Sequence, residues 1–219
     1  MKSNLIKAVN LFGDSIFDNA VYVGYTNSVS AHLRKNSPMA VQLDAVDGYT
    51  TDQVITKAEI EMSRRFGRAN GGIVSVGGND ALSIVHEFAT PVANIENAFD
   101  RIRPHLVRFE ASYERMIKKM LEHFELENLR VCTIYDSIPV SRSEHLTESM
   151  LIGLNLYNGV ITKLADRYGV TILDLRNICT EDSDYSEVSP IEPSSSGGLK
   201  IAKAINATFG HKGRNYEPS

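Results

Sequence analysis

Residues 8–18 read AVNLFGDSIFD and contain the first strand pattern of the chain. The first five residues are apolar apart from Asn10, and Gly13 ends the run. This is the pattern of a short buried β-strand that leads into a turn. A helical pattern follows, so Ser15 is expected to lie at a helix N-terminus, where backbone N–H groups can meet developing negative charge.

Four more runs of the same kind follow along the chain, at residues 39–46, 71–76, 129–135 and 170–175. Strands that are apolar almost throughout are buried on both faces, as in a parallel sheet between two helix layers. Amphipathic stretches that predict helices lie between and after them, at residues 52–66, 95–126, 148–168 and 197–209. Pro104 is expected to kink or divide the second of these helices. The alternation predicts an α/β fold, a three-layer α/β/α sandwich around a five-stranded parallel sheet.

Length and composition predict one domain over residues 1–219, because no Pro/Gly/Ser-rich linker divides the chain. The formal charge is −4, from 23 basic and 27 acidic residues, and gives no general attraction to nucleic acid. No stretch of about 18 apolar residues predicts a membrane span, and no signal peptide is recognisable, so we expect a cytoplasmic protein. Two cysteines, Cys132 and Cys179, form neither a disulfide framework nor a zinc site. We expect no metal and no cofactor.

Ligands of parallel α/β sheets gather beyond the carboxyl ends of the strands. The segments that follow the first three strands are residues 13–19, 47–51 and 77–80. Each also fits a structural role when taken alone. Ser15 fits a helix cap and Gly48 a turn glycine, while residues 77–80 fit a turn whose Asn tolerates positive φ.

Together and in this order, the three segments closely resemble the SGNH (GDSL-type) hydrolase family. Residues 12–18 look like the serine block of that family, with Ile16 where Leu is common. Gly48 with Tyr49-Thr50-Thr51 looks like the second block, and Gly77-Gly78-Asn79-Asp80 matches the third. Residues 197–202 resemble the start of the last helix. The resemblance implies a flavodoxin-like order of the five strands.

The resemblance also implies roles for individual residues. Ser15 would be the nucleophile of a hydrolase that acts on small ester or acylated substrates. The oxyanion hole would consist of the N–H groups of Ser15 and Gly48 and the side-chain amide of Asn79. Glycine suits this role because a backbone donor without a side chain can approach the substrate closely.

The fourth block departs from the family pattern, in which Asp-x-x-His precedes the last helix. Ser189 and Glu192 stand where that Asp and His are expected, and residues 180–203 contain no histidine. Glu192 could act as the base if burial or a neighbouring carboxylate, Asp184 or Glu187, raised its pKa. Ser-Glu-Asp peptidases of the sedolisin type resemble this solution on an unrelated fold.

Other interpretations stay open. Glu192 could be a structural loop residue, with a displaced histidine as base: His86 or His145 from a loop, or His211 beyond the last helix. The protein could also be a non-catalytic SGNH-fold module that binds a small ligand without a base. Another flavodoxin-like protein, such as a receiver domain or a flavin carrier, is a further alternative, although residues 77–80 and 174–176 do not cleanly supply the acidic residues and the lysine of a receiver site. The acidic run at residues 181–184 has the character of a solvated face.

Overall fold

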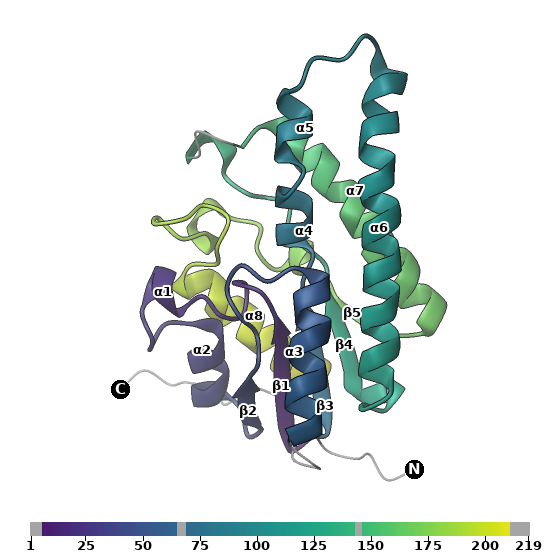
Figure 1. Cartoon of the computed structure of the whole chain (residues 1–219). Helices are drawn as coiled ribbons and strands as arrows, with labels where there is room; N and C mark the ends of the chain where they lie inside the picture. Colours follow the sequence, from purple (N-terminus) through teal and green to yellow (C-terminus); the bar gives the residue numbers. More distant parts are fainter. Residues whose placement is uncertain (1–5, 65–68, 143–145, 211–219) are drawn as a thin grey trace.

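A computed structural model describes residues 6–64, 69–142 and 146–210 (Figure 1). Five parallel strands form one sheet in the order β2-β1-β3-β4-β5. Their bounds are β1 Ala8–Gly13, β2 Ala40–Leu43, β3 Gly71–Ser75, β4 Leu129–Cys132 and β5 Thr171–Leu173. All five predicted strands are therefore present, most of them shorter than predicted at the carboxyl end. The apolar residues that follow the strand ends belong to loops, and these loops carry the candidate site.

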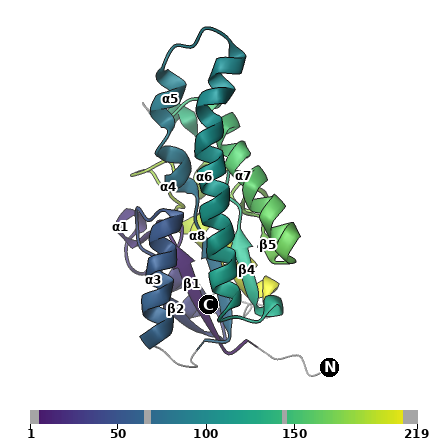
Figure 2. The same cartoon turned by 45° about the vertical axis from the view of Figure 1, so that its right-hand side comes forward.

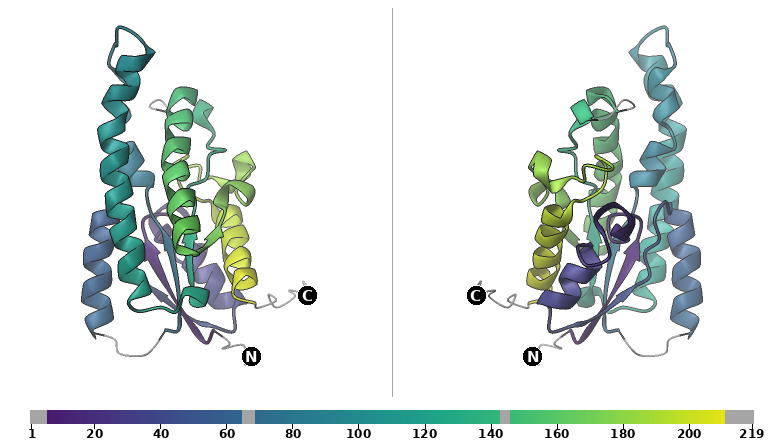
Figure 3. Two further views of the ribbon diagram at one scale, coloured as in Figure 1. Left: turned by 90° about the vertical axis from the view of Figure 1, so that its right-hand side faces the viewer. Right: turned by 90° about the vertical axis from the view of Figure 1, so that its left-hand side faces the viewer.

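Helices cover both faces of the sheet (Figure 3). One face packs against α3 Thr51–Arg64, α6 Ile95–Leu121 and α7 Glu148–Tyr168. The other packs against α2 Val29–Asn36 and α8 Ser195–Thr208. Successive residues of β1 point to opposite layers, so Leu11 is buried against α2 and α8 whereas Phe12 is buried in the core of α3, α6 and α7. The predicted three-layer α/β/α sandwich is confirmed.

Short elements complete the described chain. They are the helices α1 Ala20–Val23, α4 Gly78–Leu82 and α5 Val85–Ala89, and 3-10 turns at Leu126–Asn128, Val140–Arg142, Leu175–Asn177 and Asp182–Asp184. The sequence analysis specified none of these helices, nor α2. Helices of four or five residues are too short to show a hydrophobic period.

The helix α6 runs through Pro104 as one element, so the prediction that Pro104 divides it is wrong. Proline removes the hydrogen bond to the carbonyl group of Asp100, and both residues are exposed, so water can reach that carbonyl. The segment after the proline is anchored in the core by Phe109, Tyr113 and Met116. Burial of these side chains offsets the cost of the missing bond.

The strand order places a crevice at the edge of the sheet that the carboxyl ends of the strands form. From β1 the chain first adds β2 on one side and then β3 on the other, so the direction of winding reverses between β1 and β3. The crevice at such a reversal, beyond the carboxyl strand ends, is where α/β sheets bind ligands. Helices α5, α6 and α7 extend beyond this edge of the sheet (Figures 1 and 2).

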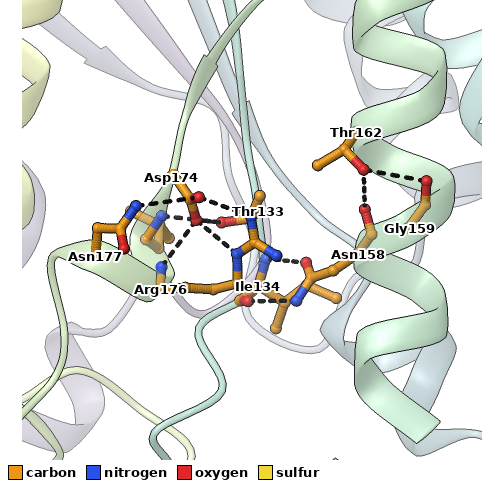
Figure 4. A network of polar contacts seen from close by, with 9 residues as sticks. Thr133, Ile134, Asn158, Gly159, Thr162, Asp174, Arg176 and Asn177 are labelled. Atoms are coloured by element: carbon orange, nitrogen blue, oxygen red, sulfur yellow. Dashed lines mark hydrogen bonds and ion pairs between the residues drawn. The ribbon is translucent and has the colours of Figure 1, made fainter. Parts of the chain in front are cut away.

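A buried polar network fixes α7 to the strand ends at this edge (Figure 4). The side chain of Asn158 accepts a hydrogen bond from the N–H of Ile134 and donates one to its carbonyl, both at 2.8 Å. The hydroxyl of Thr133 donates to Oδ1 of Asp174 at 2.7 Å and joins the ends of β4 and β5.

None of the described helices is both long enough and apolar enough to cross a membrane.

Candidate active site

Ser15 lies in a tight turn directly after β1 and is only 7% exposed. The N–H of Asp14 donates to the carbonyl of Ser75 on β3, and Oδ1 of Asp14 accepts from the N–H of Ile16, both at 3.1 Å. Residues 14–18 form a single hydrogen-bonded turn, and the next helix begins only at Ala20. The expected helix N-terminus at Ser15 is therefore wrong. Buried bonds within the turn and to β3 position the serine instead.

Glu192 reaches Ser15 from the loop that precedes α8. The Ser15 hydroxyl donates a hydrogen bond to the Glu192 carboxyl group, which is only 4% exposed. The pKa of Glu192 is raised to about 8, mainly by burial and to a smaller extent by the nearby carboxylates of Asp14 and Asp47, although the bond from Ser15 lowers it. Among the described residues, Oε2 of Glu192 has no hydrogen-bond partner. This carboxyl group is therefore poised to change its protonation near neutral pH.

Asn79 lies at the start of α4, opposite the turn of Ser15. Its amide nitrogen donates to the carbonyl oxygen of Tyr49 at 3.0 Å, which leaves the second N–H of the same nitrogen for another acceptor. The neighbouring Asp80 accepts hydrogen bonds from the N–H and the hydroxyl of Thr51, both at 3.0 Å. These bonds tie the loop after β2 to the loop after β3.

Gly48 lies beside Asn79 on an exposed turn and does not line the pocket of Ser15. Its φ of +81° lies in the left-handed region, and nothing lies within 4 Å of the position that a Cβ atom would take. Backbone conformation, rather than lack of space, therefore favours glycine there. Two bonds tie the turn to the segment after β1: Asp47 donates its N–H to the side chain of Asp18 at 3.1 Å and accepts from the hydroxyl of Tyr22 at 2.9 Å.

One pocket has Ser15, Asn79 and Glu192 in its wall. It contains about 730 Å³ of space, including the part open to solvent. Most of the wall is apolar and comes from α4 and α5 on one side and α7 on the other, with Leu82, Val85, Phe88, Met150, Leu151 and Leu154 among the lining residues. The sequence analysis predicted the polar end of this site but not its apolar walls.

Asp14 is a further lining residue that sequence reasoning missed. Burial raises the pKa of its carboxyl group to about 7, with smaller contributions from the negative charges of Asp80 and Asp47, while hydrogen bonds from backbone N–H groups lower it. The sequence signal that could have identified Asp14 as a site residue is its position directly before Ser15. The pocket thus holds two buried carboxyl groups with raised pKa values.

The expected carboxylate partners of Glu192 are wrong. Asp184 forms an ion pair with Lys200 at 2.7 Å, and Glu187 is exposed. Asp184 is also completely buried, so residues 181–184 are not the purely solvated face that their composition suggested. The 3-10 turn directs Asp184 inward while Glu181 and Asp182 remain exposed.

The structure places no described histidine in the pocket wall. His86 belongs to α5, with a side chain 69% exposed and 3.4 Å from Glu87, so the prediction that it lines the site from a loop is wrong. His145 and His211 lie outside the described residues. In the part of the chain that is described, no three His, Cys, Asp or Glu side chains group to hold a metal ion. Both cysteines are free and buried.

Solved structures share this fold at low sequence identity. A lipase/acylhydrolase from Enterococcus faecalis is 16% identical with a TM-score of 0.66, over 97% of this chain and 100% of that one. A lipolytic G-D-S-L family member from Veillonella parvula is 11% identical with a TM-score of 0.69, over 92% and 97% of the two chains. An acetyl xylan esterase variant from Geobacillus stearothermophilus is 14% identical with a TM-score of 0.65, over 97% of each.

A search among curated proteins gave no match. The sequence model of the GDSL-like lipase/acylhydrolase family matches residues 11–197, which include the turn of Ser15, the loops of Gly48 and Asn79, and the loop of Glu192. This match covers well over half of the chain. The protein therefore belongs to the GDSL-like lipase/acylhydrolase family.

Proposed function

We propose that the protein is an esterase in which Ser15 is the nucleophile and the carboxylate of Glu192 is the general base. The observation that carries this proposal is the hydrogen bond from the Ser15 hydroxyl to a buried Glu192. A serine hydroxyl is a weak nucleophile until a base takes its proton. Glu192 is the group in contact with that proton, and it occupies the position at which the family pattern has histidine.

The raised pKa of Glu192 supports the role of base. An ordinary carboxylate, with a pKa near 4.5, is a poor acceptor for a serine proton. A pKa of about 8 makes the ionised form far more basic. The same shift leaves only about one molecule in ten ionised at pH 7, so activity is expected to increase up to alkaline pH.

The proposed reaction has two halves, and in each half Glu192 takes up one proton and then returns it. Oγ of Ser15 forms a bond to the ester carbonyl carbon while its proton moves to Glu192. The carbon–oxygen bond to the alcohol then breaks, and the alcohol oxygen takes that proton. Water next attacks the acyl-enzyme and gives a proton to Glu192, and Oγ of Ser15 recovers it as the carboxylic acid leaves.

The negative charge on the carbonyl oxygen requires hydrogen-bond donors. We assign this role to the free N–H of the Asn79 amide, the backbone N–H of Ser15 and the backbone N–H of Gly48. The bond from Asn79 to Tyr49 holds the amide in place before substrate binds. Loss of one such donor typically costs about 3–4 kcal/mol of transition-state stabilisation. Gly48 lies on the exposed turn outside the pocket wall.

The direct test is Ser15→Ala in an assay with p-nitrophenyl butanoate. We expect the rate to fall about 10⁴-fold or more, because the atom that forms the acyl-enzyme is removed. Ser83→Ala is the matched control, since this exposed serine follows α4 and its hydroxyl donates to the backbone carbonyl of Asp80. Equal rates for wild type and Ser15→Ala would show that the hydrolysis does not use Ser15.

A binding module without catalysis is the second candidate function. The observation that favours it is again the raised pKa of Glu192, because a protonated carboxyl group at neutral pH can bind a ligand but cannot remove a proton. A fluorophosphonate distinguishes the two functions, since it modifies a serine only when the serine is activated. Absence of any adduct at pH 9, together with binding of a neutral acyl compound, would favour the binding module.

A further inference from the structure

The pocket of Ser15 is chemically divided along its length. Its charged side chains, Asp14 and Glu192, lie with Ser15 and Asn79 at the end next to the strand edge. Beyond them no charged side chain of the described residues lines the wall, which consists mainly of aliphatic and aromatic groups from α4, α5 and α7. Proton transfer to and from Ser15 uses only the first part. The apolar part of the pocket therefore takes no part in this proton transfer.

The apolar part extends away from the sheet along α7. Tyr157 marks the near end, because the adjacent Asn158 is bonded to Ile134 at the end of β4 (Figure 4). Met150 lies near the start of α7, two helical turns before Tyr157. Helix α7 extends beyond the sheet (Figure 1). Seven residues of helix span about 10 Å. An extended hydrocarbon chain with carbon–carbon bonds of about 1.5 Å covers that length with roughly eight carbons.

The outer wall is closed by contact between α5 and α7. Gly153 on α7 is buried, and a Cβ atom at that position would lie 2.3 Å from Cζ of Phe88 on α5. The absence of a side chain at Gly153 therefore lets the Phe88 ring pack against the backbone of α7. Both residues line the pocket. The two helices thus meet along one side of the apolar part, which remains partly open to solvent.

We propose that this pocket holds the acyl chain of the substrate and that the protein prefers acyl groups of about six to ten carbons to acetyl groups. This inference rests on the proposed function. The acyl group stays bonded to Ser15 through the second half of the reaction, whereas the alcohol must leave so that water can enter. An apolar pocket that begins at Ser15 suits the part that stays. Each methylene that moves from water into it is expected to increase kcat/KM about fourfold.

Two ester series distinguish the acyl chain from the alcohol chain. In p-nitrophenyl esters from acetate to dodecanoate, kcat/KM is expected to rise with acyl length to about eight carbons and then to level off. In alkyl acetates from ethyl to octyl, measured by acid release, it is expected to change less than about threefold. A decline from acetate onward, or a rise confined to the alcohol series, would overturn the proposal.

Two substitutions on α7 locate the chain. Met150→Trp puts a larger side chain at the far end and should lower the octanoate-to-butanoate ratio of kcat/KM at least tenfold. Ile152→Trp is the control on the same helix, because Ile152 is 70% exposed and outside the pocket wall, and it should leave the ratio unchanged. Equal ratios in wild type and both variants would place the chain elsewhere.

A binding measurement separates failure of this inference from failure of the proposed function. Calorimetry with the neutral probes octanamide and butanamide needs no turnover, and octanamide is expected to bind on the order of 100-fold more tightly. A protein that hydrolyses no ester but shows this difference retains the acyl pocket and loses the esterase assignment. A protein that hydrolyses esters but binds both amides equally retains the esterase assignment and loses the acyl pocket.

Discussion

Two buried carboxyl groups in the loop before α8, Asp184 and Glu192, have opposite surroundings. Asp184 is 0% exposed, and its Oδ2 accepts from Nζ of Lys200 at 2.7 Å and from two backbone N–H groups at 3.1 Å. Glu192 is 4% exposed and has the Ser15 hydroxyl as its bonding partner, with two carboxylates nearby. The two carboxyl groups are nearly equally buried. Asp184 has a cation and N–H donors that compensate its negative charge, whereas Glu192 has a hydroxyl group.

These surroundings distinguish a carboxyl group that stabilises the fold from one that can react. A carboxylate that accepts hydrogen bonds from a cation and several N–H donors holds the chain around it. Asp184 does this for residues 180 and 181 and for the start of α8. When a carboxyl group is buried without a cation nearby, burial destabilises its ionised form. The pKa of the group rises, and its carboxylate is therefore more basic. The comparison predicts that substitution of Glu192 changes activity and the pH dependence of stability, whereas substitution of Asp184 lowers stability and leaves activity nearly unchanged.

The largest effect is expected for Glu192→Gln. The amide can accept the hydrogen bond from Ser15 but cannot take its proton, so kcat should fall on the order of 10³-fold while the fold persists. Steady-state kinetics with p-nitrophenyl butanoate measure this, and circular dichroism verifies folding. Glu187→Gln, an exposed residue of the same loop, is the control. If kcat were unchanged in Glu192→Gln, Glu192 would have only a structural role, as we infer for Asp184.

The same variant should become more stable relative to wild type as pH rises. Folded wild type keeps the Glu192 proton up to a pKa of about 8, whereas the unfolded chain loses it near 4.5. The folded state therefore binds more protons between these values, and its stability falls as pH rises through them. The advantage of Glu192→Gln at pH 9 over pH 4 is expected to be on the order of 4 kcal/mol. Urea unfolding across this range measures it, and a pH-independent difference between the proteins would refute the raised pKa.

A smaller effect, of the opposite kind, is expected for Asp184→Asn. Loss of the charge leaves Lys200 and two N–H groups with a weaker acceptor, which should cost about 2 kcal/mol of unfolding free energy. The side chain of Lys200 is 40% exposed, so solvent moderates the loss. The kcat of the folded variant should stay within about threefold of wild type. Asp182→Asn, exposed on the same 3-10 turn, should change neither quantity.

Sequence reasoning succeeded where one local pattern determines the structure. Each strand was identifiable from its apolar run, because a strand buried on both faces has few polar positions. The polar residues after β1 and β3 were identifiable because parallel strands bring their carboxyl ends to one edge. Ser15, Asn79 and Glu192 accordingly lie in the wall of one pocket.

The remainder depends on contacts between distant segments. The pairing of Asp184 with Lys200 joins residues 16 positions apart across a turn whose direction the sequence does not reveal. The apolar pocket arises from α4, α5 and α7, and a buried aliphatic residue in a pocket wall has the same pattern as one in the core. The raised pKa of Asp14 reflects burial by several loops rather than its neighbours in sequence.

The most direct test of the central claim, that Glu192 activates Ser15, is the rate of Ser15 modification by a fluorophosphonate from pH 5 to pH 10. Mass spectrometry locates the adduct. In wild type the adduct should form on Ser15 with a rate that rises around a midpoint near pH 8, the pKa of Glu192. In Glu192→Gln the reaction should be on the order of 10³-fold slower and lack that midpoint. An adduct on another residue, or the same rate and midpoint in Glu192→Gln, would contradict the claim.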